Sequence, residues 1–179
     1  MTTELEVLKR VSDGLTAQGL AFMLTGSFAM ARYTTPRMTR DIDLVVALME
    51  DDVDKVVKEF NDDFYLDADD ARSAVQSERL FNMMHLSSGV KIDLVVLKST
   101  IYRRLEFERR QRALVGTVDT WIVSREDLIL SKLVWARDAH SDVQRRDVRQ
   151  LLDADIDREY LRRWAGELGV QALLEELSH

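Results

Sequence analysis

The chain has 179 residues and a formal net charge of -7, and 46% of its residues are hydrophobic. It contains no cysteine, which excludes disulfide bonds, thiol catalysis and cysteine-ligated zinc. No apolar run is long enough for a membrane span, and the first residues lack the basic stretch and apolar core of a signal peptide. We therefore expect a globular cytoplasmic protein with no membrane partner.

Hydrophobic spacing predicts both helices and strands in residues 1–123. The expected elements, in chain order, are a helix over 3–18, a strand over 21–24, a short helix from Gly26-Ser27 to about 33, a strand over 41–46, a helix over 51–60, a brief strand over 64–66, and a loop or short helix over 69–76. Ser87-Ser88-Gly89 predicts the turn of a hairpin with strands over 80–86 and 90–97. A further strand is expected over 112–123, with Gly116 as a bulge or turn.

The sequence after Ser124 predicts helices alone, over about 126–138, 142–152, 157–168 and 170–177. Ser124 and Asp127 resemble a capping box, with the serine as the N-cap of the first of these helices. The predicted fold class is therefore α/β (α+β), with a mixed-sheet core over 1–123 and a C-terminal helical extension over 124–179 packed on the core.

Carboxylates gather on two of the predicted strands. Asp41 and Asp43 are separated by one residue, so they point to the same face of a strand, and Asp93 lies within a second apolar run. If these strands are neighbours, the side chains converge, and close carboxylates oppose one another's ionisation unless a cation lies between them. Mg²⁺ prefers such oxygen ligands. The alternative is that these acids are solvated strand ends.

The order of these motifs resembles the signature of the nucleotidyltransferase superfamily of the DNA polymerase beta type. Leu24-Thr25-Gly26-Ser27 supplies its first element, and Asp41, Asp43 and Asp93 fill its acid positions. The resemblance implies two Mg²⁺ ions, held by Asp41 and Asp43, with Asp93 completing one shell and accepting the proton of the attacking hydroxyl.

The same resemblance implies a nucleotide site. The Gly26-Ser27 turn is expected to present backbone N–H groups and a hydroxyl to the β- and γ-phosphates of an NTP. Arg32, Arg37 and Arg40 lie in or beside the segment between the two signature elements and are candidate phosphate contacts.

The helical part contains a lysine and an aspartate at inward positions. Lys132 lies between Leu128 and Trp135 on a helix that is apolar on both sides, and Asp147 falls in the stripe formed with Val143 and Leu151. Inward charges need partners. One interpretation is a buried ion pair between adjacent helices, and the other is that Lys132 reaches the nucleotide phosphates while Asp147 orients it or the acceptor.

Residues 126–133 and 145–152 resemble the late motifs of AbiEii-type and MenT-type nucleotidyltransferases, toxins of abortive-infection and toxin–antitoxin systems. This resemblance implies that Lys132 and Asp147 are functional and that Arg145 or Arg146 contacts phosphate. The resemblance leaves the acceptor open among tRNA, a protein and a small molecule, and it makes a cognate antitoxin protein a candidate partner.

The sequence thus predicts a magnesium-dependent nucleotidyltransferase that moves NMP from an NTP to a hydroxyl on an RNA end, a protein or a small molecule. The alternative is a catalytically idle member of the fold that binds a nucleotide or a partner protein. A small-molecule modifier, such as an antibiotic adenylyltransferase, is a third hypothesis. The basic segment 98–112 is a candidate surface for a phosphate-bearing partner, and the alternative is that residues 103–112 form a solvated helix face and strand edge.

Overall fold

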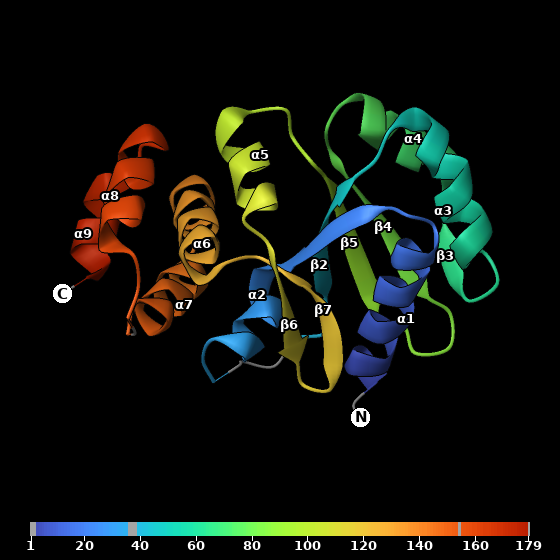
Figure 1. Cartoon of the computed structure of the whole chain (residues 1–179), viewed down its shortest axis with the longest axis horizontal. Helices are drawn as coiled ribbons and strands as arrows, with labels where there is room; N and C mark the ends of the chain where they lie inside the picture. Colours follow the sequence, from blue (N-terminus) through green and yellow to red (C-terminus); the bar gives the residue numbers. More distant parts are fainter. Residues whose placement is uncertain (1–2, 36–38, 154, 179) are drawn as a thin grey trace. The chain divides into compact units, whose positions relative to one another are not determined.

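The computed structural model describes residues 3–35, 39–153 and 155–178 (Figure 1). The chain divides into two compact units, Met1–Val123 and Ser124–His179. None of the helices in the described ranges combines the length and the apolar character that crossing a bilayer requires.

The first unit is built on a seven-stranded mixed sheet with strand order β3-β4-β5-β2-β1-β7-β6. Its strands are β1 (Ala21–Thr25), β2 (Ile42–Ala47), β3 (Phe64–Leu66), β4 (Leu80–His85), β5 (Lys91–Val96), β6 (Gln111–Val115) and β7 (Val118–Ile122). Its helices are α1 (Thr3–Ala17), α2 (Gly26–Ala29), α3 (Val53–Phe60), α4 (Ala68–Gln76) and α5 (Ile101–Glu108), with single 3₁₀ turns at Met30–Arg32 and Glu50–Asp52. The mixed-sheet α/β class predicted from the sequence is confirmed.

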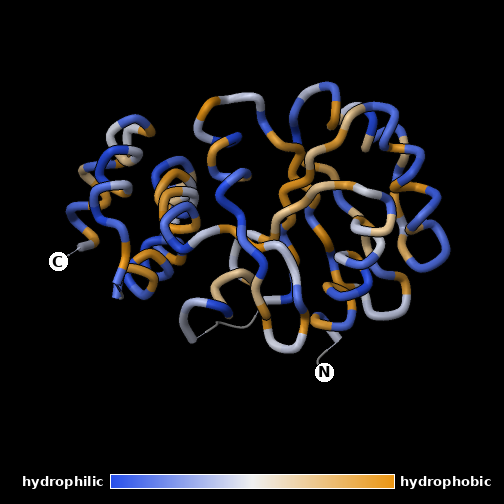
Figure 2. Tube along the Cα trace, in the orientation of Figure 1, coloured by the Kyte–Doolittle hydropathy of each residue, from blue (hydrophilic) through white to orange (hydrophobic). Residues whose placement is uncertain are grey.

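The two central strands β2 and β5 alternate between buried and partly exposed side chains. Ile42, Leu44 and their neighbours Ile92 and Leu94 are completely buried, and Figure 2 shows the hydrophobic character concentrated along the central strands. Because side chains alternate between the two faces of a strand, the residues between them, including Asp43 and Asp93, lie on the less covered face. The sheet thus separates a core face from a face that carries the carboxylates.

Helices α1, α3 and α4 contact the strands, and α3 contacts both α1 and α4. Arg10 of α1 joins α1 to the end of α3. Its guanidinium donates hydrogen bonds to Glu59 and Asp63 and lies 4.9 Å from the centroid of the Phe60 ring. The apolar residues of these helices, such as Leu8, Val56 and Phe60, are buried, so these helices supply much of the core of this unit.

The second unit consists of α6 (Arg125–Ala139), α7 (Asp142–Leu152), α8 (Arg158–Glu167) and α9 (Gln171–Leu177). Ser124 is the N-cap of α6, as predicted, and its hydroxyl accepts a hydrogen bond from the backbone N–H of Asp127. The Asp127 side chain is buried and accepts hydrogen bonds from Ser124 Oγ (2.5 Å) and the Tyr160 hydroxyl (2.7 Å). Ser124 therefore fixes both the start of α6 and a buried carboxylate.

Two segments differ from the sequence prediction. Residues 111–122 form a hairpin of two strands, β6 and β7, instead of one strand, and Gly116, with a φ of 59°, lies at the turn, which was one of its two predicted roles. Helix α5 was not given bounds among the predicted elements, although a solvated helix face within 103–112 was one interpretation of the basic segment. Its basic residues obscured the apolar pattern, in which Tyr102 and Phe107 are buried.

We predict that Ser124→Ala lowers the free energy of unfolding by about 1 to 2 kcal/mol, because the variant loses an N-cap and a donor to a buried carboxylate. Urea unfolding measures this. The matched control is Ser77→Ala, which changes an exposed serine that caps no helix N-terminus. Equal stability of the two variants would contradict the assignment.

Candidate active site

The sheet brings Asp43 and Asp93 together. Strands β2 and β5 are parallel neighbours, and Asp43 is directly paired with Asp93 in their register. Both side chains lie on the less covered face, so their carboxylates are side by side near the start of each strand. The two strands are thus neighbours, which was the condition for their carboxylates to converge.

The Gly26-Ser27 turn lies against the carboxylate of Asp43. Strand β1 is antiparallel to β2, with Thr25 opposite Asp43, and Gly26 follows directly with a φ of 65°. A Cβ atom at Gly26 would be only 2.0 Å from Asp43 Oδ2. Only glycine combines this left-handed conformation with such a close approach of backbone to side chain. The first and second predicted motifs therefore meet at one place.

The other candidate site residues between Gly26 and Asp43 are close to these two residues in the sequence. Ser27 is buried, with 6% of its surface exposed, in the short helix α2. Arg40 and Asp41 are exposed and directly precede β2, and Arg32 is exposed at the end of the 3₁₀ turn. Arg37 lies outside the described residues.

Lys91 is a basic residue of this site that the sequence did not lead us to predict as functional. It is two residues before Asp93 on the same face of β5, and its Nζ lies 3.1 Å from Asp93 Oδ1. Extending the β2–β5 register by one residue sets Asp41 beside Lys91. The pKa of Lys91 is raised, and its contact with Asp93 is the largest cause. The negative charges of Asp93, Asp41 and Asp43 raise the pKa further, whereas partial burial lowers it.

The carboxylates fit a cation, although they are not arranged around one. No group of three acidic or histidine side chains is positioned to enclose a metal ion in the part of the chain that the structure describes. Asp93 Oδ1 is nevertheless buried and lacks a hydrogen-bond partner, since the Lys91 ammonium is near it but not in hydrogen-bonding geometry. An orphaned carboxylate oxygen beside a second carboxylate suits a hard divalent cation such as Mg²⁺.

Asn82 is a second residue that the sequence analysis missed. It is paired with Asp93 in the antiparallel register of β4 and β5, and it is exposed. Its amide therefore borders the Asp93 carboxylate on the side away from Asp43. The only signal in the sequence is its polar character inside an apolar strand, which does not by itself predict a neighbour.

The second unit contains the buried ion pair between Lys132 and Asp147. Lys132 is 1% exposed, and its Nζ donates hydrogen bonds to Asp147 Oδ2 (2.7 Å) and to Gln144 Oε1 (2.9 Å). The ion-pair interpretation is therefore observed, joining α6 to α7. Gln144, also buried, was not predicted as a partner. The phosphate-binding role of Lys132 and Asp147 stays a prediction.

The arginines beside Asp147 differ in their surroundings. Arg146 is exposed, whereas Arg145 forms an ion pair with Glu176 of α9. The sequence predicts a phosphate contact for Arg145 or Arg146. Of the two, Arg146 is the one whose side chain lies exposed on the surface.

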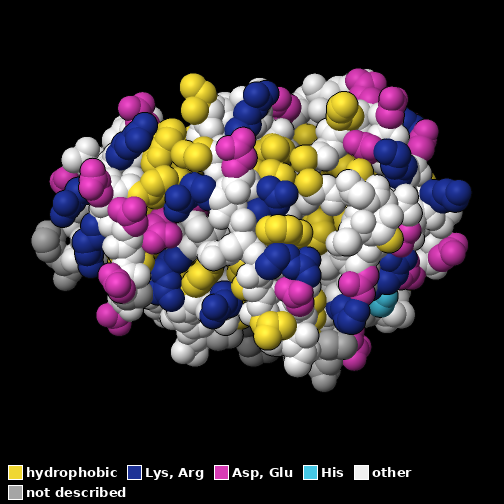
Figure 3. Space-filling view, viewed as in Figure 1, with side chains coloured by type: hydrophobic (Ala, Val, Ile, Leu, Met, Phe, Trp, Pro, Cys, Tyr) yellow, Lys and Arg dark blue, Asp and Glu magenta, His cyan; other side chains and the backbone are white. Residues whose placement is uncertain are grey.

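The basic segment 98–112 is partly engaged in its own unit. Arg103 forms an ion pair with the buried Glu106 (2.7 Å), and Arg112 pairs with Asp119. The Arg110 guanidinium lies 4.2 Å from the Phe107 ring centroid and 5.0 Å from that of Trp121, and burial lowers its pKa. On the face seen in Figure 3, positive and negative side chains are interspersed. The segment is therefore better described as a structural element than as a uniform basic surface.

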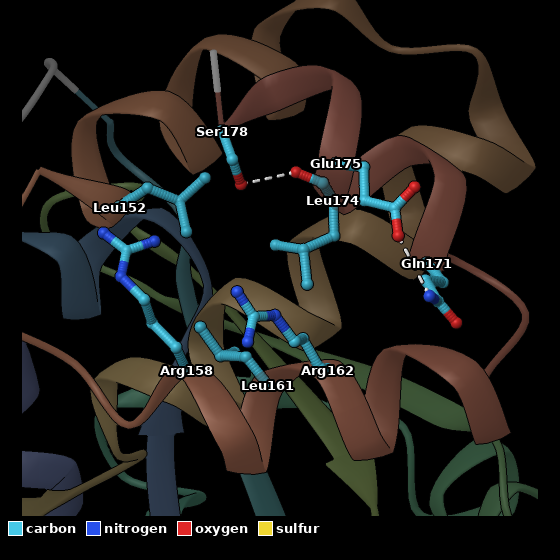
Figure 4. A pocket seen from close by; sticks show the side chains of 8 residues that line it. All are labelled: Leu152, Arg158, Leu161, Arg162, Gln171, Leu174, Glu175 and Ser178. Carbon is cyan, nitrogen blue, oxygen red and sulfur yellow. Dashed lines mark hydrogen bonds between the residues drawn. The ribbon is translucent and has the colours of Figure 1, made fainter.

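A hollow of about 230 Å³ opens in the second unit (Figure 4). Its lining consists of apolar and polar side chains, namely Leu152, Arg158, Leu161, Arg162, Gln171, Leu174, Glu175 and Ser178. It contains none of the carboxylates or the glycine turn described above, so it is a separate feature of the helical unit.

Residues 3–169 match the family described as nucleotidyltransferase of unknown function (DUF6036). The chain belongs to this family. The match covers the carboxylate strands, the glycine turn and the Lys132–Asp147 pair. None of the curated proteins compared with this chain matches its sequence.

Several solved structures share the fold at low sequence identity. An antigenic nucleotidyltransferase-like protein from Paracoccidioides brasiliensis has a TM-score of 0.66 and 15% identity, over 98% of this chain and 88% of that chain. A putative nucleotidyltransferase from Thermotoga maritima has a TM-score of 0.54 and 15% identity, over 91% and 92%. The antibiotic-resistance factor ANT(2'')-Ia, solved with adenylyl-2''-tobramycin, has a TM-score of 0.57 and 12% identity, over 99% and 97%. At this identity they show the fold alone.

We predict that Gly26→Ala destabilises the protein by more than Gly89→Ala. Both glycines have a φ near 65 to 69°, but a Cβ at Gly89 would meet nothing within 4 Å, whereas at Gly26 it would collide with Asp43. Gly89→Ala therefore isolates the backbone strain, about 1 to 2 kcal/mol, and urea unfolding of both variants measures the rest. Equal losses would contradict the close approach of Gly26 to Asp43.

We also predict that Lys132→Ala lowers the free energy of unfolding by about 3 to 5 kcal/mol, because it leaves Asp147 buried without its counterion. The double variant Lys132→Met/Asp147→Leu should recover most of this loss, since apolar residues replace both charges. A double variant as unstable as Lys132→Ala would show that the cost has another origin.

Proposed function

We propose that this chain transfers a nucleoside monophosphate from an NTP to a hydroxyl acceptor. Magnesium would be held by Asp43 and Asp93, with Asp41 as a third ligand. The observation that carries the proposal is the direct pairing of Asp43 with Asp93, with the Gly26 turn against Asp43. Membership of a nucleotidyltransferase family supports the same reaction class. We further propose that the protein acts in the cytoplasm.

In the proposed reaction the acceptor oxygen bonds to the α-phosphorus, and the bond from that phosphorus to the bridging oxygen of the β-phosphate breaks, releasing pyrophosphate. Asp93 takes the proton of the acceptor hydroxyl. Ser27 and the turn before it bind the β- and γ-phosphates, with Arg40 as a further contact. Magnesium, when bound, supplies positive charge against the charge that develops on the attacking and leaving oxygens, as one ion or two.

Three classes of acceptor are compatible with this chemistry. An RNA end such as that of tRNA, with a cognate antitoxin protein, follows from the resemblance to AbiEii- and MenT-type toxins. A protein hydroxyl is the second. A small molecule is the third, and ANT(2'')-Ia, solved with an adenylylated tobramycin, shares this fold. We propose the RNA acceptor, because the toxin-like motifs extend through the helical unit.

The competing function is nucleotide or partner binding without catalysis. The observation that favours it is that an ammonium group, that of Lys91, lies beside Asp93 in the place that a metal ion would need. Calorimetry with each NTP separates the two functions, because a binding module shows affinity without release of pyrophosphate.

The direct test incubates the purified chain with each α-labelled NTP, Mg²⁺ and a cell extract. We expect label on RNA, and we expect Asp43→Asn to lower transfer at least about a hundredfold, since loss of a direct ligand exceeds the 10- to 100-fold cost of losing its outer partners. Asp62→Asn, which alters an exposed carboxylate in a turn, is the matched control and should keep full activity. Full transfer by both Asp43→Asn and Asp93→Asn would end the proposal.

A further inference from the structure

The charge balance of the site depends on Lys91. It is half-buried, with its side chain 38% exposed, and it lies on the same strand face as Asp93. Asp43 is paired with Asp93, and the same register places Asp41 next to Lys91, so the ammonium is bordered by the three carboxylates that we assign to the metal. Without a cation these carboxylates would repel one another.

We propose that Lys91 is a built-in counterion that competes with the divalent cation for the carboxylates of Asp43 and Asp93. This inference rests on the proposed function. The Lys91 ammonium offsets part of the negative charge of the carboxylates in the absence of metal, and a metal ion that binds Asp93 Oδ1 displaces it. Lys91 thereby weakens metal binding and makes the site responsive to the concentration of the free ion.

The geometry distinguishes this role from that of an ordinary surface ion pair. The contact leaves Asp93 Oδ1 buried and without a hydrogen bond, so the ammonium supplies charge but not full satisfaction of the oxygen. A divalent ion bound at Asp93 Oδ1 would both neutralise more of the negative charge and give this oxygen a direct partner, because such ions bond to carboxylate oxygens. An exposed pair, in contrast, would already be completed by water.

The test is calorimetric titration of the full chain with Mn²⁺ in the absence of nucleotide. We expect Lys91→Gln to bind Mn²⁺ at least about tenfold more tightly than the natural chain, because a nearby unit charge shifts such equilibria by one to three orders of magnitude. Lys58→Gln removes the same charge from an exposed position of α3 and should leave the affinity unchanged. Asp93→Asn should abolish binding.

The outcomes separate this inference from the proposed function. Equal Mn²⁺ affinity in the natural chain and Lys91→Gln, with binding lost in Asp93→Asn, would overturn the counterion role and leave the metal site standing. Absence of Mn²⁺ binding in both the natural chain and Lys91→Gln would overturn the metal site, and the counterion role with it.

A second measurement needs no variant. The rate at which an acylating reagent modifies Lys91 in the natural chain, followed by mass spectrometry, should rise several-fold when Mg²⁺ is added, because the displaced ammonium becomes accessible. Lys58 should react at the same rate in both conditions. A rate for Lys91 that does not respond to Mg²⁺ at concentrations that saturate the site would overturn the displacement.

Discussion

The parallel register between β2 and β5 is the constraint on which the candidate site depends. It fixes Asp43 directly beside Asp93, and the antiparallel register of β1 with β2 then sets the Gly26 turn against the Asp43 carboxylate. A slip of one residue in either pairing would send a carboxylate to the apolar face, where Ile42, Leu44, Ile92 and Leu94 are fully buried. The hydrophobic alternation that builds the core therefore also positions the acids.

Adjacent carboxylates impose an electrostatic cost, and the structure offsets it with the Lys91 ammonium rather than with hydrogen-bond donors to every oxygen. The buried charge of the helical unit, that of Lys132, has different surroundings. Lys132 is buried and donates hydrogen bonds to Asp147 and Gln144, an arrangement that joins two helices. An open, incompletely satisfied group is suited to exchange for a ligand, whereas a closed network is suited to holding a structure together.

Most of the fold could be predicted from the sequence because its elements carry local signals: the apolar runs of β2 and β5, the turn Ser87-Ser88-Gly89, and the cap at Ser124. The bounds of helix α5 were missed because basic residues dilute its apolar face. The acids were recognisable by their spacing, but Lys91, Asn82 and Gln144 were not recognised as neighbours. Their contacts depend on strand register and helix packing, which join residues far apart in the chain and leave no local pattern.

Anomalous scattering from a crystal of the protein soaked in Mn²⁺ would show whether Asp43 and Asp93 share a divalent cation. We expect a peak within about 2.2 Å of a carboxylate oxygen of each residue, close to the near-octahedral distances of a small hard cation, with the Lys91 ammonium moved away. A site saturated with Mn²⁺ elsewhere on the molecule, with Asp43 and Asp93 free of metal, would contradict it.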